Sequence, residues 1–224
     1  MATLRRVRGA DSPLVERITH VVYDERTQEW ATPDGCWDLV VLQHQGTTMV
    51  FQSGNTTRPV LLENGPGDGF LAISFKPGVF VPRTPGFQTV DGGLVRPLVS
   101  ARRFAMESET LEIPTFENAE HLVDRLVRRG VLARDELVES VAAGQPRAAT
   151  PRSLQRHFLA TMGMSPKQFE QIRRASRAVA LLERGMAPAA VALEAGYADQ
   201  PHLTRSLKSI MGQTPGEIAR REGR

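Results

Sequence analysis

The chain has 224 residues, of which 41% are hydrophobic, and a formal net charge of +3. This length suits two domains of ordinary size, and the hydrophobic content is enough to fill their cores. No stretch reaches the roughly 18 apolar residues that a membrane span needs, and the first residues lack the apolar core of a signal peptide. One cysteine cannot form an internal disulfide, so we expect a cytoplasmic protein.

Residues 1–105 have the texture of short strands and turns. Apolar runs at 36–42, 48–51, 60–62 and 70–75 are separated by Gly, Pro, Asn and Asp, which is typical of strands joined by turns. We therefore predict a β-rich domain over 1–105.

Cys36 could be a redox sensor, a metal ligand with His44, or an acceptor of alkyl groups. A reactive thiolate needs cationic neighbours and exposure, whereas Cys36 stands beside Asp34 and Asp38 at the start of an apolar run. A buried structural cysteine is the favoured interpretation. Because His20 and His44 lack a close H-x-H or C-x-x-C partner, we expect no metal site.

The middle of the chain predicts a link between two domains. Residues 106–117 are acidic, contain proline and lack strong periodicity, so we predict a linker between domains at 1–105 and 118–224. The spacing of apolar residues predicts a helix over 119–129. This helix either begins the second domain or forms part of a dimer contact.

Residues 150–168 and 199–217 repeat one pattern, 49 positions apart. Each copy opens with Thr150 or Asp199, whose side-chain oxygen can accept from free N–H groups of a first helical turn. Each closes at a glycine, which can adopt the left-handed conformation that ends a helix, and a new capping box with proline follows. The predicted helices cover 151–162 and 200–211, and the closing glycines are Gly163 and Gly212.

Further helices complete each copy. Between Ser165 and Gly185 the spacing of apolar residues predicts a helix of about 19 residues, which would span roughly 28 Å between the two copies. A short helix over 189–195 precedes the second copy across a tight turn, which is the pattern of a helix-turn-helix unit. A helix over 134–143 precedes the first copy, but the link after it is longer, so the first turn is less regular. A plain helical bundle with solvated arginines is the simpler alternative for one such unit, and the duplication disfavours it.

These segments resemble the AraC/XylS transcription regulators, whose DNA-binding domain holds two helix-turn-helix units joined by a long helix. The strongest match is GYADQPHLTRSLKSIMGQTP at 196–215, and RSLQRHFLATMGMSPKQF at 152–169 follows. The resemblance covers about the last 100 residues. PDGCWDL at 33–39 and FKPG at 75–78 look like one subgroup of these regulators.

The resemblance places base reading on the exposed face near the start of each repeated helix. Arg suits the guanine edge and Gln the adenine edge. Pro201 departs from the polar residue that many relatives carry, and its side chain cannot hydrogen-bond a base. The implied base-reading residues are Arg152, Gln155, Arg156, Gln200, His202 and Arg205. The candidate phosphate contacts, each of which could also be an ordinary solvated charge, are Arg147, Lys167, Arg173, Arg174 and Lys208.

Basic and acidic side chains are distributed unevenly between the two halves of the chain, as expected when the second half binds nucleic acid. Residues 1–116 carry 11 basic and 13 acidic side chains, whereas residues 117–224 carry 17 and 12.

The resemblance also implies a cupin-like or jelly-roll sensor fold for the first domain, with an effector-binding or dimerising role. Aromatic side chains there could wall an effector pocket, although core packing is the simpler interpretation for each. These side chains are Trp30, Trp37, Phe51, Phe75, Phe80 and Phe87.

We therefore expect an α+β protein: a β-rich cupin-like domain followed by an all-α domain with two helix-turn-helix units joined by a long helix. The expected function is sequence-specific transcriptional regulation in the bacterial cytoplasm, on the nucleoid when bound to DNA, and responsive to an effector. The alternatives are a metal-dependent cupin-type enzyme fused to a DNA-binding domain and a constitutive regulator whose first domain only contacts proteins. We expect no enzymatic activity and no cofactor. The expected partners are double-stranded DNA, a small-molecule effector and RNA polymerase, with no membrane and with the protein as a monomer or homodimer.

Overall fold

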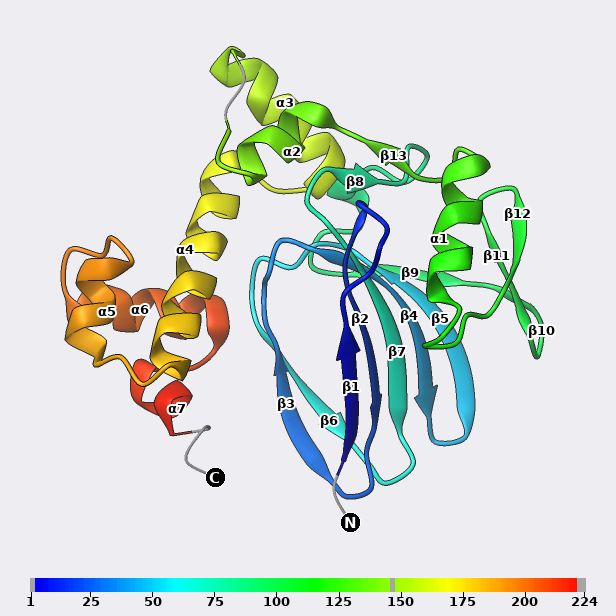
Figure 1. The fold of residues 1–224 in the computed structure, drawn as a ribbon, viewed down its shortest axis with the longest axis horizontal. Coiled ribbons are helices and arrows are strands. Elements are labelled where there is room, and N and C mark those ends of the chain that lie inside the picture. Colours follow the sequence, from blue (N-terminus) through cyan, green and yellow to red (C-terminus); the bar gives the residue numbers. More distant parts are fainter. Residues whose placement is uncertain (1–2, 146–147, 221–224) are drawn as a thin grey trace.

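The computed structural model describes residues 3–145 and 148–220, and it has a β-rich N-terminal domain followed by a helical C-terminal domain (Figure 1). This confirms the predicted α+β class. The first domain is built on an antiparallel sheet in the order β1-β2-β7-β4-β5-β9. Its strands are β1 (Leu4–Arg8), β2 (Val15–Val22), β4 (Trp37–His44), β5 (Thr47–Ser53), β7 (Gly69–Phe75) and β9 (Gly93–Arg96).

Alternating burial explains why the central strands form. In β4, Trp37, Leu39 and Val41 are buried while the residues between them are only partly covered, so one face of the strand packs into the core. Leu39 lies opposite Ile73 of β7, and both are buried. Each of the four apolar runs that predicted strands overlaps a strand of the structure, and only Cys36, just before β4, lies outside.

Smaller ladders complete the domain. The strand β3 (Thr27–Ala31) pairs with β6 (Val60–Asn64), and β8 (Val79–Phe80) pairs with β13 (Ala133–Arg134), just before the helical domain. A three-residue 3-10 helix, η1 (Gly86–Gln88), follows β8.

The predicted linker at 106–117 differs from the structure. The strands β10 (Leu98–Ser100), β11 (Arg103–Met106) and β12 (Glu109–Glu112) form a small antiparallel sheet in this region. The physical reason is burial, because Phe104, Met106 and Leu111 are fully covered in the core of the β-rich domain.

The helix α1 (Ala119–Arg128) also belongs to that core. Leu122, Val123 and Leu126 pack in the same cluster as the sheet residues Ile18 and Phe75. The β-rich body therefore continues past residue 118, where we expected the second domain to begin, and it reaches the pairing of β13 with β8.

The helical domain repeats one design twice. We call α2 with α3 unit 1, and α5 with α6 unit 2; α4 connects them. Each unit packs mainly around its own buried cluster, one centred on Phe158 and Phe169 and the other on Leu203 and Leu207. The helices are α2 (Glu136–Ala142), α3 (Pro151–Met162), α4 (Pro166–Glu183), α5 (Pro188–Glu194), α6 (Gln200–Met211) and α7 (Pro215–Ala219).

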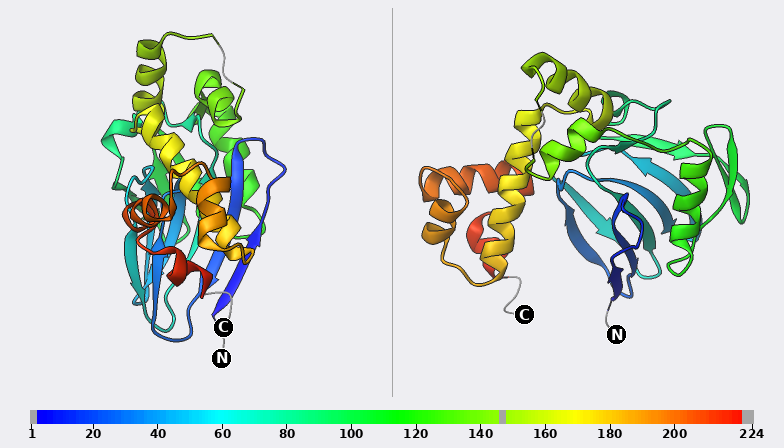
Figure 2. Two further views of the ribbon diagram at one scale, coloured as in Figure 1. Left: turned by 90° about the vertical axis from the view of Figure 1, so that its left-hand side faces the viewer. Right: turned by 45° about the horizontal axis from the view of Figure 1, so that its top comes forward.

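The helical domain lies against one side of the β-rich domain, and α4 runs along that side from unit 1 to unit 2 (Figure 2). The described residues contain no helix with the length and apolar character needed to cross a membrane.

Candidate nucleic-acid interface

The helix α3 begins and ends where its sequence predicts. Thr150 Oγ1 accepts a hydrogen bond from the Ser153 backbone N–H at 3.2 Å, and Gly163 adopts the left-handed conformation with φ of 72° after the last turn. Phe158 is buried, and its ring centre lies 5.5 Å from that of Phe169 in α4. Burial of this face leaves the opposite face of α3 to solvent.

The solvent face of α3 carries the three predicted base-reading side chains of unit 1. Arg152, Gln155 and Arg156 are all exposed, and they line one surface hollow of about 630 Å³. The residues known to line the hollow, all in the described part of the chain, include no Asp or Glu. This surface therefore attracts a polyanion.

Phe87 forms another part of the same hollow. It belongs to η1 in the β-rich domain, and its exposed fraction is 59%, which is large for a phenylalanine. The sequence suggests this ring as a wall of an effector pocket, whereas in the structure it lies beside Arg152 and Arg156. Only the tertiary contact between η1 and α3 brings these residues together, so no local sequence signal could have shown it.

The helix α6 repeats the design of α3. The Asp199 carboxylate accepts from the His202 backbone N–H at 2.6 Å, and Gly212 ends the helix with φ of 72°. Leu203 and Leu207 are fully buried beneath it. The predicted base-reading side chains Gln200 and Arg205 are exposed on the other face.

His202, the third candidate of unit 2, is partly engaged in its own turn. Its ring packs edge-on against Tyr197, with centres 5.2 Å apart, and Nδ1 accepts from the Ala198 backbone N–H at 3.4 Å. A neutral ring that accepts at Nδ1 carries its hydrogen on Nε2. His202 therefore supports the turn and keeps one donor for an external acceptor.

The candidate phosphate contacts divide into two groups. Lys167 and Lys208 are exposed. Lys208 Nζ lies 4.0 Å from a Glu217 carboxylate oxygen, and 60% of its side chain remains exposed. Arg147 lies outside the described residues.

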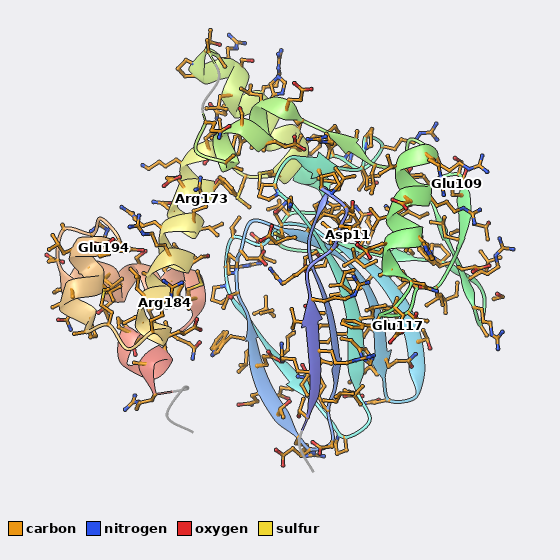
Figure 3. The ribbon with its side chains drawn as sticks, viewed as in Figure 1. Asp11, Glu109, Glu117, Arg173, Arg184 and Glu194 are labelled. Carbon is orange, nitrogen blue, oxygen red and sulfur yellow. The ribbon has the colours of Figure 1, made fainter. Side chains whose placement is uncertain are left out.

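The two arginines of the connector helix are partly exposed and also make contacts with other parts of the helical domain. Arg173 donates to the Val141 carbonyl of α2 at 3.4 Å, whereas Arg174 donates to the Gly196 carbonyl of the turn in unit 2, also at 3.4 Å. The guanidinium of Arg174 also lies 4.6 Å from the ring centre of Tyr197. Arg173 lies on the half of α4 nearer unit 1 (Figure 3). These two residues connect α4 to both units. This structural role is separate from the phosphate contacts predicted for them.

The β-rich domain contacts both units at the same point of the repeat. The residues that end α3 and α6, Gly163 and Gly212, are 49 positions apart, like the repeat itself. A methyl group added at Gly163 would lie 2.4 Å from the Gly86 carbonyl oxygen of η1. One added at Gly212 would lie 2.9 Å from the Trp30 ring of β3. Both glycines are therefore required twice, once by their backbone conformation and once by the adjacent domain.

The aromatic side chains proposed to wall an effector pocket are dispersed. Trp37 and Phe75 are stacked in the core with ring centres 4.2 Å apart, and Trp37 Nε1 donates to the Val79 carbonyl at 2.7 Å. Phe51 and Phe80 are partly buried. Trp30 lies at the boundary with the helical domain, as Phe87 does, and it lines a smaller cavity there.

Cys36 is buried, and burial, followed by the charge of Asp34, raises the pKa of its thiol far above the ordinary value. A thiol in that state is a poor nucleophile. His44 pairs with Asp68, with Nδ1 and the carboxylate oxygen 3.0 Å apart. Across 3–145 and 148–220, no three His, Cys, Asp or Glu side chains gather as metal ligands would.

Comparison with known proteins bears on the helical domain above all. Residues 148–221 match the sequence profile described as a helix-turn-helix domain. No curated protein sequence matches the chain. Among solved structures, ToxT from Vibrio cholerae is similar over 98% of both chains, with 10% identity and a TM-score of 0.37.

Proposed function

We propose that this chain is a DNA-binding transcriptional regulator of the AraC type, and that it reads a two-part DNA sequence with α3 and α6. The match of residues 148–221 to a helix-turn-helix profile supports the proposal. The observation that carries the proposal is the repeated geometry: each helix is capped at its start, buried along one face, and polar and cationic along the other.

Base reading belongs to the exposed side chains near the start of each helix. An arginine can donate two hydrogen bonds to guanine O6 and N7, and a glutamine can pair with adenine N6 and N7, with about 1–3 kcal/mol of discrimination for each bidentate contact. We assign base reading to Arg152, Gln155, Arg156, Gln200, His202 and Arg205.

The spacing of the two helices supports simultaneous binding. The connector α4 has 18 residues, so it is about 27 Å long at 1.5 Å per residue. Successive major grooves on one face of B-DNA are about 34 Å apart. The helices α3 and α6 lie at the two ends of this connector, and each is set to the side of its axis. Their separation is therefore close to the distance between neighbouring major grooves.

Phosphate binding positions the protein without reading sequence. We assign this role to Lys167 and Lys208, which are exposed at the start of α4 and late in α6. Arg147 remains a prediction for the same role. Arg173 and Arg174 are better explained as the residues that hold α4 to the two units.

We also propose that the β-rich domain makes DNA binding responsive to an effector. It contacts both units through Gly163 and Gly212, so a change in its conformation would alter the relative position of α3 and α6. A ligand shifts such an equilibrium only by its difference in affinity between the two arrangements.

Selection of random duplex DNA by the purified full chain tests the proposal. At near-physiological salt we expect two short enriched blocks about one helical turn, roughly 34 Å, apart. Arg205→Ala should lose base preference within one block only. Arg184→Ala, which changes an exposed arginine outside both recognition helices, should leave the motif unchanged. Enrichment without any motif would mean binding to the backbone alone and would overturn the sequence-reading role.

A further inference from the structure

A cavity of about 230 Å³ lies between the two domains. The connection from β3 to β4 forms one wall, α4 forms another, and the residues around the end of α6 together with α7 close the third side. Side chains from both domains are therefore required to build it. It lies next to the contact between Trp30 and Gly212, because Met211 and Gln213 also line it.

The walls of this cavity combine an aromatic ring, a thioether and two acidic groups. Trp30, Met211, Asp34 and Glu183 are among the lining residues, and the lining known from the described residues includes no Lys or Arg. Electron-rich ring faces and carboxylates are both groups that attract cations.

The two carboxylates differ in the hydrogen bonds and ion pairs that they already make within the protein. Asp34 pairs with Arg17, and its other oxygen accepts from the Cys36 backbone N–H at 2.8 Å, so its position is fixed. Glu183, on the last turn of α4, has no ion pair or hydrogen bond with any described residue. The cavity is thus lined by one carboxylate that Arg17 and a backbone N–H hold in place and by one, on the exposed Glu183, that has no partner among the described residues.

Size and donor set narrow the class of ligand. Pockets for drug-sized molecules have volumes of about 300–1,000 Å³, so this cavity suits a smaller molecule. A bare metal ion is disfavoured, since the described residues gather no group of three acidic, histidine or cysteine ligands. Apolar lining residues such as Val179 and Ile218 suit alkyl groups.

We propose that this cavity between the two domains binds a small organic ammonium ion, with its cationic head between the Trp30 ring and the carboxylate of Glu183. Such a ligand would contact both domains at once and would therefore stabilise their docked arrangement at unit 2. Its regulatory meaning depends on the proposed effector response, whereas its binding does not.

Choline is a suitable probe because 3,3-dimethylbutan-1-ol has nearly the same shape without the charge. With the full chain and no DNA, choline should raise the melting temperature in a concentration-dependent way and give a saturable calorimetric signal. The neutral alcohol should do neither. Equal binding of both compounds would show an apolar site and would overturn the proposal.

Two variants and a matched control locate the site. Glu183→Gln and Trp30→Leu should each weaken choline binding at least about threefold, since each removes one attraction for the cation. Glu170→Gln, a change at a 70% exposed position on the same helix and outside the cavity, should leave binding unchanged. Equal loss in all three variants, or no loss in either cavity variant, would contradict the assignment.

A panel of tetramethylammonium, butylammonium and choline covers the proposed class. Failure of all three to bind, while selection still gives a two-block DNA motif, would overturn this inference and leave the proposed function standing. Binding of choline without any effect on affinity for the selected DNA would keep the site but would contradict the effector response.

Discussion

The two helix-turn-helix units share one design, yet they are joined to the β-rich domain in different ways. Unit 1 is held through the backbone: the Asp135 N–H donates to the Gly78 carbonyl at 2.8 Å, β13 pairs with β8, and Gly163 lies against Gly86. Unit 2 is separated from that attachment by α4 and lies against the ring of Trp30. A repeated motif thus has one copy attached through backbone pairing and one that contacts the β-rich domain through a side chain.

The internal contacts of the two units differ in the same sense. In unit 1, the Asp135 carboxylate caps α2 and also lies 2.6 Å from His157 Nδ1 of α3. In unit 2, α5 has no side-chain cap, and the turn depends on Tyr197, His202 and Arg174. We expect unit 1 to be the stable reference against which unit 2 is positioned.

Removal of the central ring of unit 1 should have the largest effect. Phe158→Ala should lower the free energy of unfolding by about 3–5 kcal/mol, because a fully buried aromatic side chain is lost. Leu207→Ala, in the core of unit 2, should cost about 2–5 kcal/mol. Denaturant unfolding followed by circular dichroism measures both. Hydrogen exchange should show that each variant opens its own unit first, and opening of the same unit in both variants would contradict the separate cores.

The next largest loss of stability should come from a methyl group added where the backbone of unit 1 contacts the β-rich domain. A methyl group at Gly86 would lie 2.4 Å from the Gly163 nitrogen, so Gly86→Ala should cost about 1–3 kcal/mol of stability through overpacking. It should also weaken binding to the two-block DNA site more than binding to either block alone.

Gly92→Ala is the matched control for Gly86→Ala. It lies in the same loop region, and the nearest atom to an added methyl group would be 3.8 Å away, so its effect should stay within about 0.5 kcal/mol. Equal behaviour of the two variants in unfolding and in DNA binding would show that the contact at Gly163 does not position unit 1.

Arginine substitutions in α3 and α6 should show that the two units recognise different parts of the DNA site. Arg156→Ala and Arg205→Ala should each cost about 1–3 kcal/mol of binding free energy on the selected DNA and relax base preference in different blocks. Binding isotherms on block-substituted duplexes measure this. An equal loss on random DNA would identify the residue as a phosphate contact.

The smallest expected effect concerns the two helix caps. Thr150→Ala and Asp199→Ala should each lower the free energy of unfolding by about 0.5–2 kcal/mol. The loss should be larger for Asp199, because its carboxylate also interacts favourably with the positive end of the α6 dipole. Thermal unfolding of the two variants side by side tests this order, and a larger loss at Thr150 would reverse it.

Local chemistry explains which parts of this fold could be predicted. The helices α3 and α6 have the predicted bounds, because caps, proline and glycine act within a few residues. The strand β1 was not predicted, since its sequence LRRVR is mostly exposed and it forms by pairing with β2. The hairpin of β11 and β12 replaced a predicted linker because long-range burial outweighed its acidic composition.

The residues of the candidate site likewise fall into those placed by local sequence and those placed by long-range contacts. The exposed face of α3 follows from helical periodicity, so Arg152 and Arg156 could be named in advance. Their neighbour Phe87 and the cavity beside Trp30 come from contacts between residues far apart in the chain, which composition and spacing do not encode. Arg174 shows the converse, since a residue predicted as a phosphate contact also contacts Gly196 and Tyr197 within the domain, which its position in the sequence did not indicate.

The paired contacts at Gly163 and Gly212 also limit how such proteins can be recombined. A chimaera that joins this helical domain to a different N-terminal domain must present a backbone without a side chain to Gly163 and a flat ring to Gly212, in the correct relative position. A donor domain that meets one condition alone would hold a single recognition helix in place. The N-terminal domain of such a chimaera should therefore be chosen first by the shape of the two small patches that contact these glycines.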